Sequence, residues 1–383
     1  MKVQLPEALK SNMPQTIWGR ILSATPVVMA VIATMLAGLA SSEMTRAQYA
    51  RSLAAQQQSK AGDQWSFFQA KRLRGAAQRN TLDLLQATVD MSPLSTERLK
   101  QSASQLPAQI DLAGAQIKET LQRASKERSD SAILQPPQKE MMEEYLQGLD
   151  GRKAQAEEVK SEMLALLGSA DVVAALASMQ RCELPDVSGN STMEHKLKAA
   201  LDAVESSRPE KETAIIVAQV DDNVLDDALR AARNRTQALD AATKPIGQAI
   251  DRVERLLVRQ TTLLQEARAI LLMGGVNSKI TPSPYNDFVA SRLRYVAGRY
   301  DAEAKLNQDI GKLCELQVRK SNQSAERHHS RSQRFFYGML AAQLGVIVAT
   351  FAIAARKRNL LWSLAAGAGL VAVGFGAYVY LFV

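Results

Sequence analysis

The sequence predicts an all-α protein with three transmembrane helices and a long helical stalk or coiled-coil bundle inserted between the first and the second span. Three observations predict this fold class. Uncharged segments of 21 to 24 residues lie near both ends of the chain. Long stretches between them lack proline and are rich in Ala, Gln, Leu, Glu, Lys and Arg, which favour helix over strand. One of these stretches also shows the three-and-four apolar spacing of a coiled coil.

Each uncharged segment is long enough to cross a membrane as a helix. A helix rises ~1.5 Å per residue and the hydrocarbon core is ~30 Å thick, so about 20 residues suffice. A cleaved signal peptide is the alternative for residues 21–42, but the apolar region of such a peptide has only ~7–15 residues. We therefore expect an uncleaved anchor. The predicted domains are a cytoplasmic N-terminus at 1–20, transmembrane helix 1 at 21–42, an extended α-helical domain at 43–334, transmembrane helix 2 at 335–355, a basic loop at 356–359 and transmembrane helix 3 at 360–383.

Aromatic and basic residues mark the ends of the predicted spans. Tryptophan is enriched at membrane interfaces, and short cytoplasmic loops carry an excess of Lys and Arg. Because the N-terminus and the loop at 356–359 are both short and positive, we expect residues 43–334 on the periplasmic or extracytoplasmic side of a bacterial inner membrane. Basic residues that flank this domain, such as Arg46 and Arg331, favour the opposite orientation. The expected interface residues are Trp18, Arg356, Lys357, Arg358 and Trp362.

The net charge of +8 does not indicate a nucleic-acid partner, because its location is wrong for one. The excess lies beside the predicted spans: residues 1–42 carry a net +2, the basic loop +3 and residues 319–334 a further +4. Positive charge next to a membrane contacts lipid headgroups or sets topology. We therefore expect the lipid bilayer as a partner, and no nucleic acid.

Two stretches without proline predict long helices that continue out of the membrane. No proline occurs in residues 42–91, so one helix can run unbroken from Ile21 for roughly 105 Å. The stretch after Pro284 is free of proline as far as Ala355 and has almost the same length. These matching lengths predict an antiparallel stalk.

The densest aromatic cluster outside the spans contains Trp65, Phe67 and Phe68. Packing in a core is the simplest explanation for it. Trp65 lies 23 residues beyond Ser42, and Gly311 lies 23 residues before Arg334, so the two residues should be at the same distance from the membrane along antiparallel helices. The predicted packing residues are therefore Trp65 and Phe68 against Leu306, Ile310 and Leu313.

Shorter helices are expected between the two long ones. The predicted ranges are 95–126 with a break near Pro107, 139–167, 171–181, 191–206, and Pro209 to Met273 with Gly274–Gly275 as the stop. The last of these helices has the clearest periodicity, with apolar side chains at six of seven positions that alternate at three and four. These positions are Ile250, Val253, Leu257, Gln260, Leu264, Ala267 and Leu271.

Glu326 and His329 are the candidate residues for a transition-metal site. Their i, i+3 spacing matches half of a di-iron ligand set in a helical bundle. The other half is missing, because His195 has Thr192 at the matching position. A polar turn at the lipid headgroups is the favoured interpretation, and a metal or pH-sensing role is the alternative. We expect no catalytic residue and no cofactor.

Two other groups of reactive side chains have simple interpretations. The four aspartates within residues 221–227 read as a solvated helix face, with a cation site as the alternative. Cys182 and Cys314 read as unpaired residues, and a disulfide is the alternative in an oxidising compartment. Small residues four apart in the spans, such as Gly338 and Ala342, allow close helix packing within one chain or between several.

Two short strings of residues resemble a known family. One is Asp63-Gln64-Trp65 with Phe68-Gln69-Ala70-Lys71 after the first span, and the other is Ala325-Glu326-Arg327-His328-His329 before the final hairpin. Both are similar to the bacterial membrane-protein family catalogued as domain of unknown function 4337, over roughly 45–80 and 320–383. The resemblance implies a membrane location and no established activity.

These patterns predict a class of function but do not indicate any chemical reaction. The expected protein is a non-enzymatic envelope scaffold or assembly subunit that acts through its helical domain, as a homo-oligomer or in a membrane-protein complex. The alternative is an extracytoplasmic ligand-sensing bundle that signals through a separate partner protein.

Overall fold

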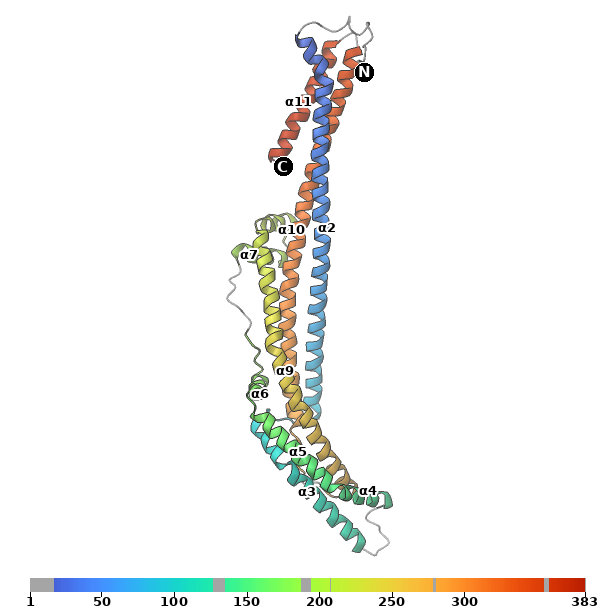
Figure 1. Ribbon diagram of the computed structural model, residues 1–383, viewed down its shortest axis with the longest axis vertical. Helices are drawn as coiled ribbons and strands as arrows, with labels where there is room; N and C mark the ends of the chain where they lie inside the picture. Colours follow the sequence, from blue (N-terminus) through green and yellow to red (C-terminus); the bar gives the residue numbers. More distant parts are fainter. Residues whose placement is uncertain are drawn as a thin grey trace, which may run out of the picture. The chain divides into compact units, whose positions relative to one another are not determined.

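The computed structural model describes residues 17–126, 135–186, 194–206, 208–277, 280–354 and 358–382. The regular elements in these ranges are helices, which confirms the predicted all-α class. In chain order they are α2 Ile17–Thr88, α3 Thr96–Lys126, α4 Pro136–Gln147, α5 Leu149–Gly168, α6 Ala170–Arg181, α7 His195–Glu205, α8 Glu210–Ala218, α9 Asp222–Met273, α10 Tyr285–Ala354 and α11 Arg358–Phe382 (Figure 1).

Three helices are long and apolar enough to cross a membrane, which indicates a membrane protein. The candidate spans lie within Ala24–Thr88 of α2, Tyr285–Ala352 of α10 and Leu360–Leu381 of α11, each with a mean hydropathy of 1.8. Taken together as one broken span, α5 and α6 pass the same test of length and composition, although 79° separates their axes. Their apolar side chains pack in a protein core that is described below.

Helices α2 and α10 are the longest elements, with 72 and 70 residues. The predicted continuity between the first span and the following helix is confirmed, although α2 ends at Thr88 and not at Met91. Helix α10 begins at Tyr285, directly after Pro284, as its proline pattern predicts.

Two predicted boundaries in the shorter helices were wrong. Helix α3 continues through Pro107, which lies buried inside it, so the expected break does not form. A proline inside a helix removes one backbone hydrogen bond, and the burial of this ring offsets that loss. The helix predicted at 139–167 divides at Gly148, whose N–H donates to the Glu144 carbonyl oxygen at 3.1 Å. The Arg152 guanidinium occupies the space that a Cβ at Gly148 would need.

The single helix predicted from Pro209 to Met273 is also wrong, because α8 ends at Ala218 and α9 begins at Asp222. Val220 in the connection is buried, at 2% exposure. The Lys320 ammonium on α10 donates to the Val220 carbonyl oxygen and lies 2.6 Å from the Asp222 carboxylate. This tertiary contact satisfies backbone groups that the break leaves open.

The chain divides into two compact units, to which α2, α9 and α10 each contribute separate parts. The membrane unit comprises Met1–Gly62, Met193–Asp227 and Gly311–Val383. The bundle unit comprises Asp63–Thr192 and Ala228–Ile310.

Large apolar side chains fill the core of the bundle unit, in which α3, α5 and the C-terminal part of α9 lie side by side (Figure 1). The largest fully buried side chains include Tyr145, Phe288 and Tyr295. The periodic face of α9 is buried as the sequence predicts, with each of the seven positions at 5% exposure or less. These positions are Ile250, Val253, Leu257, Gln260, Leu264, Ala267 and Leu271.

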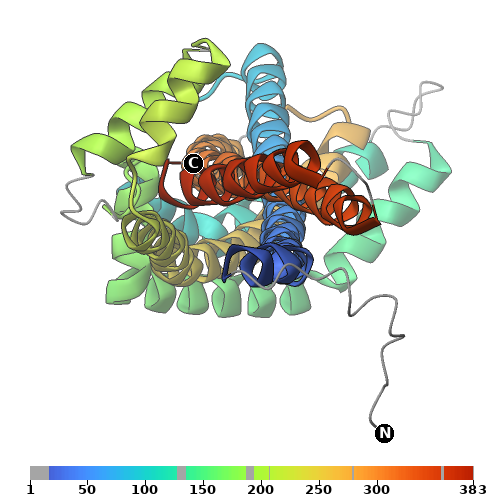
Figure 2. The ribbon, with the colours of Figure 1, turned by 90° about the horizontal axis from the view of Figure 1, so that it is seen from above.

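Alanines make up half of the buried core of the membrane unit, beside Met29, Leu36, Phe335 and Val379, where α2, α10 and α11 pack together (Figure 2). Ala33, Ala342 and Ala372 are among its buried residues. Trp362, expected at the membrane interface, is 8% exposed and packs in a cluster with Ala349 of α10. Small residues let helices approach closely within a membrane, so this core has the composition expected of packed spans.

The other predicted interface residues are described only in part. Trp18 and Arg358 fall within the bounds of α2 and α11. Arg356 and Lys357 lie outside the described residues. An interfacial position for these four residues stays a prediction.

Candidate functional site

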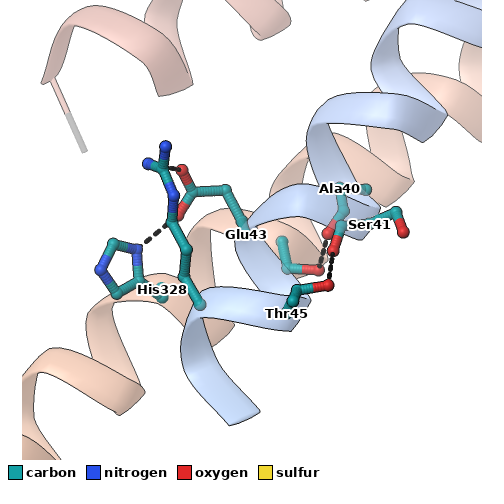
Figure 3. Close-up of polar contacts among 7 residues, drawn as sticks. Ala40, Ser41, Glu43, Thr45 and His328 are labelled. Atoms are coloured by element: carbon teal, nitrogen blue, oxygen red, sulfur yellow. Dashed lines mark hydrogen bonds and ion pairs between the residues drawn. The ribbon is translucent and has the colours of Figure 1, made fainter. Parts of the chain in front are cut away.

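The first charged residue after the first predicted span is Glu43, and its carboxylate contacts the helix that leads into the second span. The partner is His328 on α10, seven residues before Phe335. His328 Nδ1 lies 2.5 Å from Glu43 Oε2 (Figure 3). Glu43 is only 8% exposed. Because a buried carboxylate is costly without a partner, this contact holds α2 and α10 in one register.

Two further groups complete this polar cluster. Arg46 Nη1 lies 3.2 Å from the second carboxylate oxygen of Glu43, so both oxygens have a partner. One helical turn further along α10, the buried Ser332 hydroxyl donates to the Ala40 carbonyl oxygen at 2.7 Å. Thr45 donates to the Ser41 carbonyl within α2, as Figure 3 shows. His328 and Ser332 are four residues apart and therefore lie on one face of α10.

A cavity of about 820 Å³ adjoins this cluster in the membrane unit. Its volume falls within the range of small-molecule sites, which is about 300–1,000 Å³. Gln317 Nε2 donates to Asp226 Oδ1 at 2.8 Å across one wall. The lining comes from three regions of the chain: Thr45, Arg46, Tyr49, Ala50, Leu53 and Gln57 of α2; Ala218, Asp222, Leu225 and Asp226 around the α8–α9 connection; and Gln317, Lys320, Ser321, Gln323, Ser324, Arg327 and His328 of α10.

The structure does not join Glu326 and His329 in one site. Glu326 is exposed and lines a cavity with Glu210 and Arg319. His329 lines a different cavity, and its Nε2 lies 3.1 Å from the Gln333 amide nitrogen. Within the described ranges, no group of three or more His, Cys, Asp or Glu side chains is placed to hold a metal ion. The metal role of this pair stays a prediction.

Sequence reasoning missed Glu43 as a functional residue. The available signal was its position, as the first carboxylate after an uncharged segment and within reach of a basic stretch on another helix. His328 was noticed only as a neighbour of the Glu326 and His329 pair. Two of the four aspartates in 221–227 bond to α10 through Gln317 and Lys320, so this patch is partly a helix-docking surface.

The aromatic cluster of the bundle unit is partly exposed. Trp65 and Phe68 form an edge-to-face pair with ring centroids 5.5 Å apart, and both are half-buried. Phe67 is 54% exposed. Ile310 and Leu313 are buried, whereas Leu306 is half-buried. Packing of Trp65 or Phe68 against these three residues stays a prediction.

A second polar cluster lies inside the bundle unit around Tyr145. The Arg152 guanidinium stacks over the Tyr145 ring at 4.3 Å and also lies 2.5 Å from the Glu266 carboxylate. Burial raises the pKa of Tyr145 to about 12. The Tyr145 hydroxyl is buried without a hydrogen-bond partner among the described residues. This cluster joins α4, α5 and α9.

Comparison with known proteins now identifies part of the chain. Residues 18–147 match the family described as Domain of unknown function (DUF4337). The family expected from the sequence is thereby confirmed over nearly all of α2 and over α3 and α4. Glu43, Trp65 and Phe68 lie within this DUF4337 region, whereas the resembling segment at 320–383 lies outside it. No curated protein and no solved structure matches the chain.

Proposed function

We propose that this membrane protein is a non-enzymatic envelope scaffold or assembly subunit in a bacterial inner membrane. Residues 43–334 are its working part, an extended helical stalk with coiled-coil contacts. The observation that carries the proposal is the continuity of α2 and α10, of 72 and 70 residues, with candidate spans. A helix of this length extends about 105 Å, whereas a span needs only ~30 Å.

Contacts between α2 and α10 in each unit support a fixed register between these helices. In the membrane unit, Ser321 Oγ donates to Gln57 Oε1 at 2.8 Å. In the bundle unit, Lys71 pairs with Glu303 across the two helices. A single hydrogen bond or half-buried ion pair of this kind adds only modest stability. We therefore infer that these two contacts align α2 with α10. The buried cores supply the rigidity that a scaffold requires.

The exposed side of α2 in the bundle unit offers a contact surface. Leu73 is 71% exposed and Leu84 is 66% exposed. They are eleven residues apart, which is close to three helical turns, so both lie on one face. We propose that this face contacts a second copy of the chain or a partner membrane protein.

Cross-linking in native membranes, followed by mass spectrometry of the linked peptides, tests this scaffold role. We expect stoichiometric links between copies or to one fixed partner, and we expect Leu84→Glu to weaken them. Gln86→Glu is the matched control, because it adds the same charge at an exposed position on the opposite side of the helix. A monomer without fixed links, or equal links in both variants, would contradict the proposed contact surface.

The proposed orientation places residues 43–334 in the periplasm. Cys182 in the bundle unit is exposed and Cys314 in the membrane unit is buried. In a Cys314→Ala variant, a membrane-impermeant maleimide should label Cys182 in intact spheroplasts. Labelling that requires detergent would place this domain in the cytoplasm instead.

A ligand-sensing bundle is the second candidate, and the cavity of about 820 Å³ favours it. This cavity combines apolar side chains such as Leu53 with charged ones such as Arg327 and Asp226. Native mass spectrometry separates the two candidates. A monomer that retains a small molecule supports a sensor, whereas a fixed assembly without one supports the scaffold.

A further inference from the structure

A separate cavity of about 500 Å³ lies in the membrane unit between α2 and α10. It shares Ala40, Ser41 and Ser332 with the Glu43 cluster, but it has no lining residue in common with the larger cavity. Its lining residues are Ala37, Ala40, Ser41 and Met44 of α2, and His329, Ser332, Gln333, Phe336, Tyr337 and Met339 of α10.

The position of this cavity coincides with the ends of two candidate spans. Ser41 is next to the last residue of the uncharged segment 21–42, and Phe336 is the second residue of the segment 335–355. Aromatic side chains such as Tyr337 favour the membrane interface. The cavity therefore lies where acyl chains meet headgroups, given that these segments span a membrane.

The lining changes from apolar to polar along α10. Ala37, Phe336 and Met339 lie on the side of the uncharged segments, whereas His329 and Gln333 lie on the side of the charged ones. A phospholipid has the same sequence of groups, with apolar chains below a polar headgroup. A small soluble metabolite lacks the apolar part that this lining would accommodate.

The polar end contains an unsatisfied hydrogen-bonding group. His329 Nδ1 is buried and has no partner among the described residues, while Nε2 lies beside the Gln333 amide. A buried nitrogen of this kind is costly unless it is bonded. An oxygen atom from a bound headgroup would satisfy it.

The charge around this end favours an anion. Residues 326–334 contain Arg327, Arg331 and Arg334 but only one acidic residue, Glu326. Each basic residue near a membrane surface attracts anionic lipids by about 1 kcal/mol.

We propose that this cavity binds one phospholipid with an anionic headgroup. The headgroup phosphate accepts a hydrogen bond from His329 and interacts with the Gln333 amide, while an acyl chain lies against Phe336 and Met339. This proposal rests on the membrane position of the spans and not on the scaffold role. A second copy of the chain is the competing occupant.

Native mass spectrometry of the full-length protein in detergent, titrated with phosphatidylglycerol or phosphatidylcholine, tests the site. We expect one retained phosphatidylglycerol per chain, held at least about fivefold more tightly than phosphatidylcholine. Ser41→Phe should abolish this retention, because the new ring fills the cavity from an exposed position on its wall. Leu344→Phe is the matched control, since Leu344 is 62% exposed on α10 and outside the cavity.

A second pair of variants tests the headgroup end without filling the cavity. His329→Ala should weaken phosphatidylglycerol binding about fivefold, whereas His329→Asn, whose amide can replace Nδ1, should retain it. Equal retention of the two lipids by the unmodified protein would overturn the proposal, as would unchanged binding in Ser41→Phe. A dimer that Ser41→Phe converts to a monomer would also overturn it, because a second copy would then be the occupant.

Discussion

The membrane unit and the bundle unit bury their helices by different means. The largest fully buried side chains among the described residues, such as Phe288 and Met163, all belong to the bundle unit. In the membrane unit, alanines such as Ala342 and Ala365 occupy the contacts between helices. Large leucines such as Leu370, at 76% exposure, point outward there.

The difference in side-chain size between the two cores is explained by the solvent around each unit, which is water for the bundle unit and lipid for the membrane unit. In water, burying a large apolar side chain stabilises the fold by about 1.5–3 kcal/mol. In lipid, that gain disappears because acyl chains are as apolar as leucine, and close packing of small residues takes its place. One chain thus combines a core of large apolar side chains, which suits water, with a core of closely packed small ones, which suits lipid.

The largest expected effect is the loss of a buried ring in the bundle unit. Phe288 is 0% exposed, so Phe288→Ala should lower the free energy of unfolding by about 3–5 kcal/mol. Phe335→Ala is the matched change in the membrane unit, where Phe335 is 2% exposed, and it should cost less because acyl chains remove most of the gain from burial. Denaturant unfolding in detergent measures both. Equal losses would remove the contrast between the two cores.

The opposite change should matter in the membrane unit. A Cβ at Gly345 would displace the movable end of Met29 and would meet Ala368 Cβ at 3.4 Å and the Ala365 carbonyl oxygen at 3.5 Å, which leaves no room for a longer side chain, whereas nothing lies within 4 Å at Gly367. Gly345→Leu should therefore cost about 1–3 kcal/mol through overpacking, and Gly367→Leu should be tolerated. Thermal unfolding in detergent measures the difference. A stable Gly345→Leu protein would show that the spans pack loosely.

The buried amide of Gln260 provides a third test of the bundle core, with a smaller expected change in stability. Gln260 is 0% exposed, its amide nitrogen donates to Ser102 Oγ at 2.7 Å, and its oxygen has no partner among the described residues. Ser102→Ala should cost about 1–2 kcal/mol by leaving the amide unpaired. Gln260→Met should be neutral or stabilising. The reverse order of stability would indicate that Gln260 fixes the register of α9 instead.

The smallest expected effect is a loss of stability in alkaline solution. Because burial raises the pKa of Tyr145 to about 12, the folded bundle unit binds this proton more tightly than the unfolded chain does. This contribution is fully present below pH ~10 and is lost as the pH rises toward ~12. At pH ~11 the loss should be about 1 kcal/mol. Tyr145→Phe should reduce this pH dependence by about 1 kcal/mol, and the remainder belongs to Tyr295 and Cys182, whose pKa values burial also raises. An unchanged pH dependence in Tyr145→Phe would contradict the assignment to Tyr145.

Patterns that repeat along one helix could be predicted from the sequence, whereas contacts between distant helices could not. The apolar spacing from Ile250 to Leu271 predicted a buried face, because residues at this spacing lie on one side of a helix and that side packs in the core. The break at Val220 depends on Lys320, which is 100 residues away in the chain. Such a partner leaves no local signal.

In the candidate site, too, the local patterns could be predicted and the contact between distant helices could not. The uncharged segments and the basic stretch at 319–334 located a membrane boundary, but they did not pair Glu43 with His328. That pairing depends on the register of two helices, and its two residues are 285 positions apart in the chain. The tolerance of α3 for Pro107 likewise depends on a core that forms only after folding.

Spin-label accessibility in proteoliposomes tests the central claim, which is that the two units occupy different solvents. In a background without native cysteines, labels at Leu370→Cys and Val173→Cys compare exposed apolar positions, at 76% and 45% exposure, in the two units. The Leu370 label should collide mainly with oxygen, which concentrates in lipid, and the Val173 label mainly with a water-soluble nickel chelate. A Val173 label that only oxygen reaches would place α6 in the membrane and contradict the account.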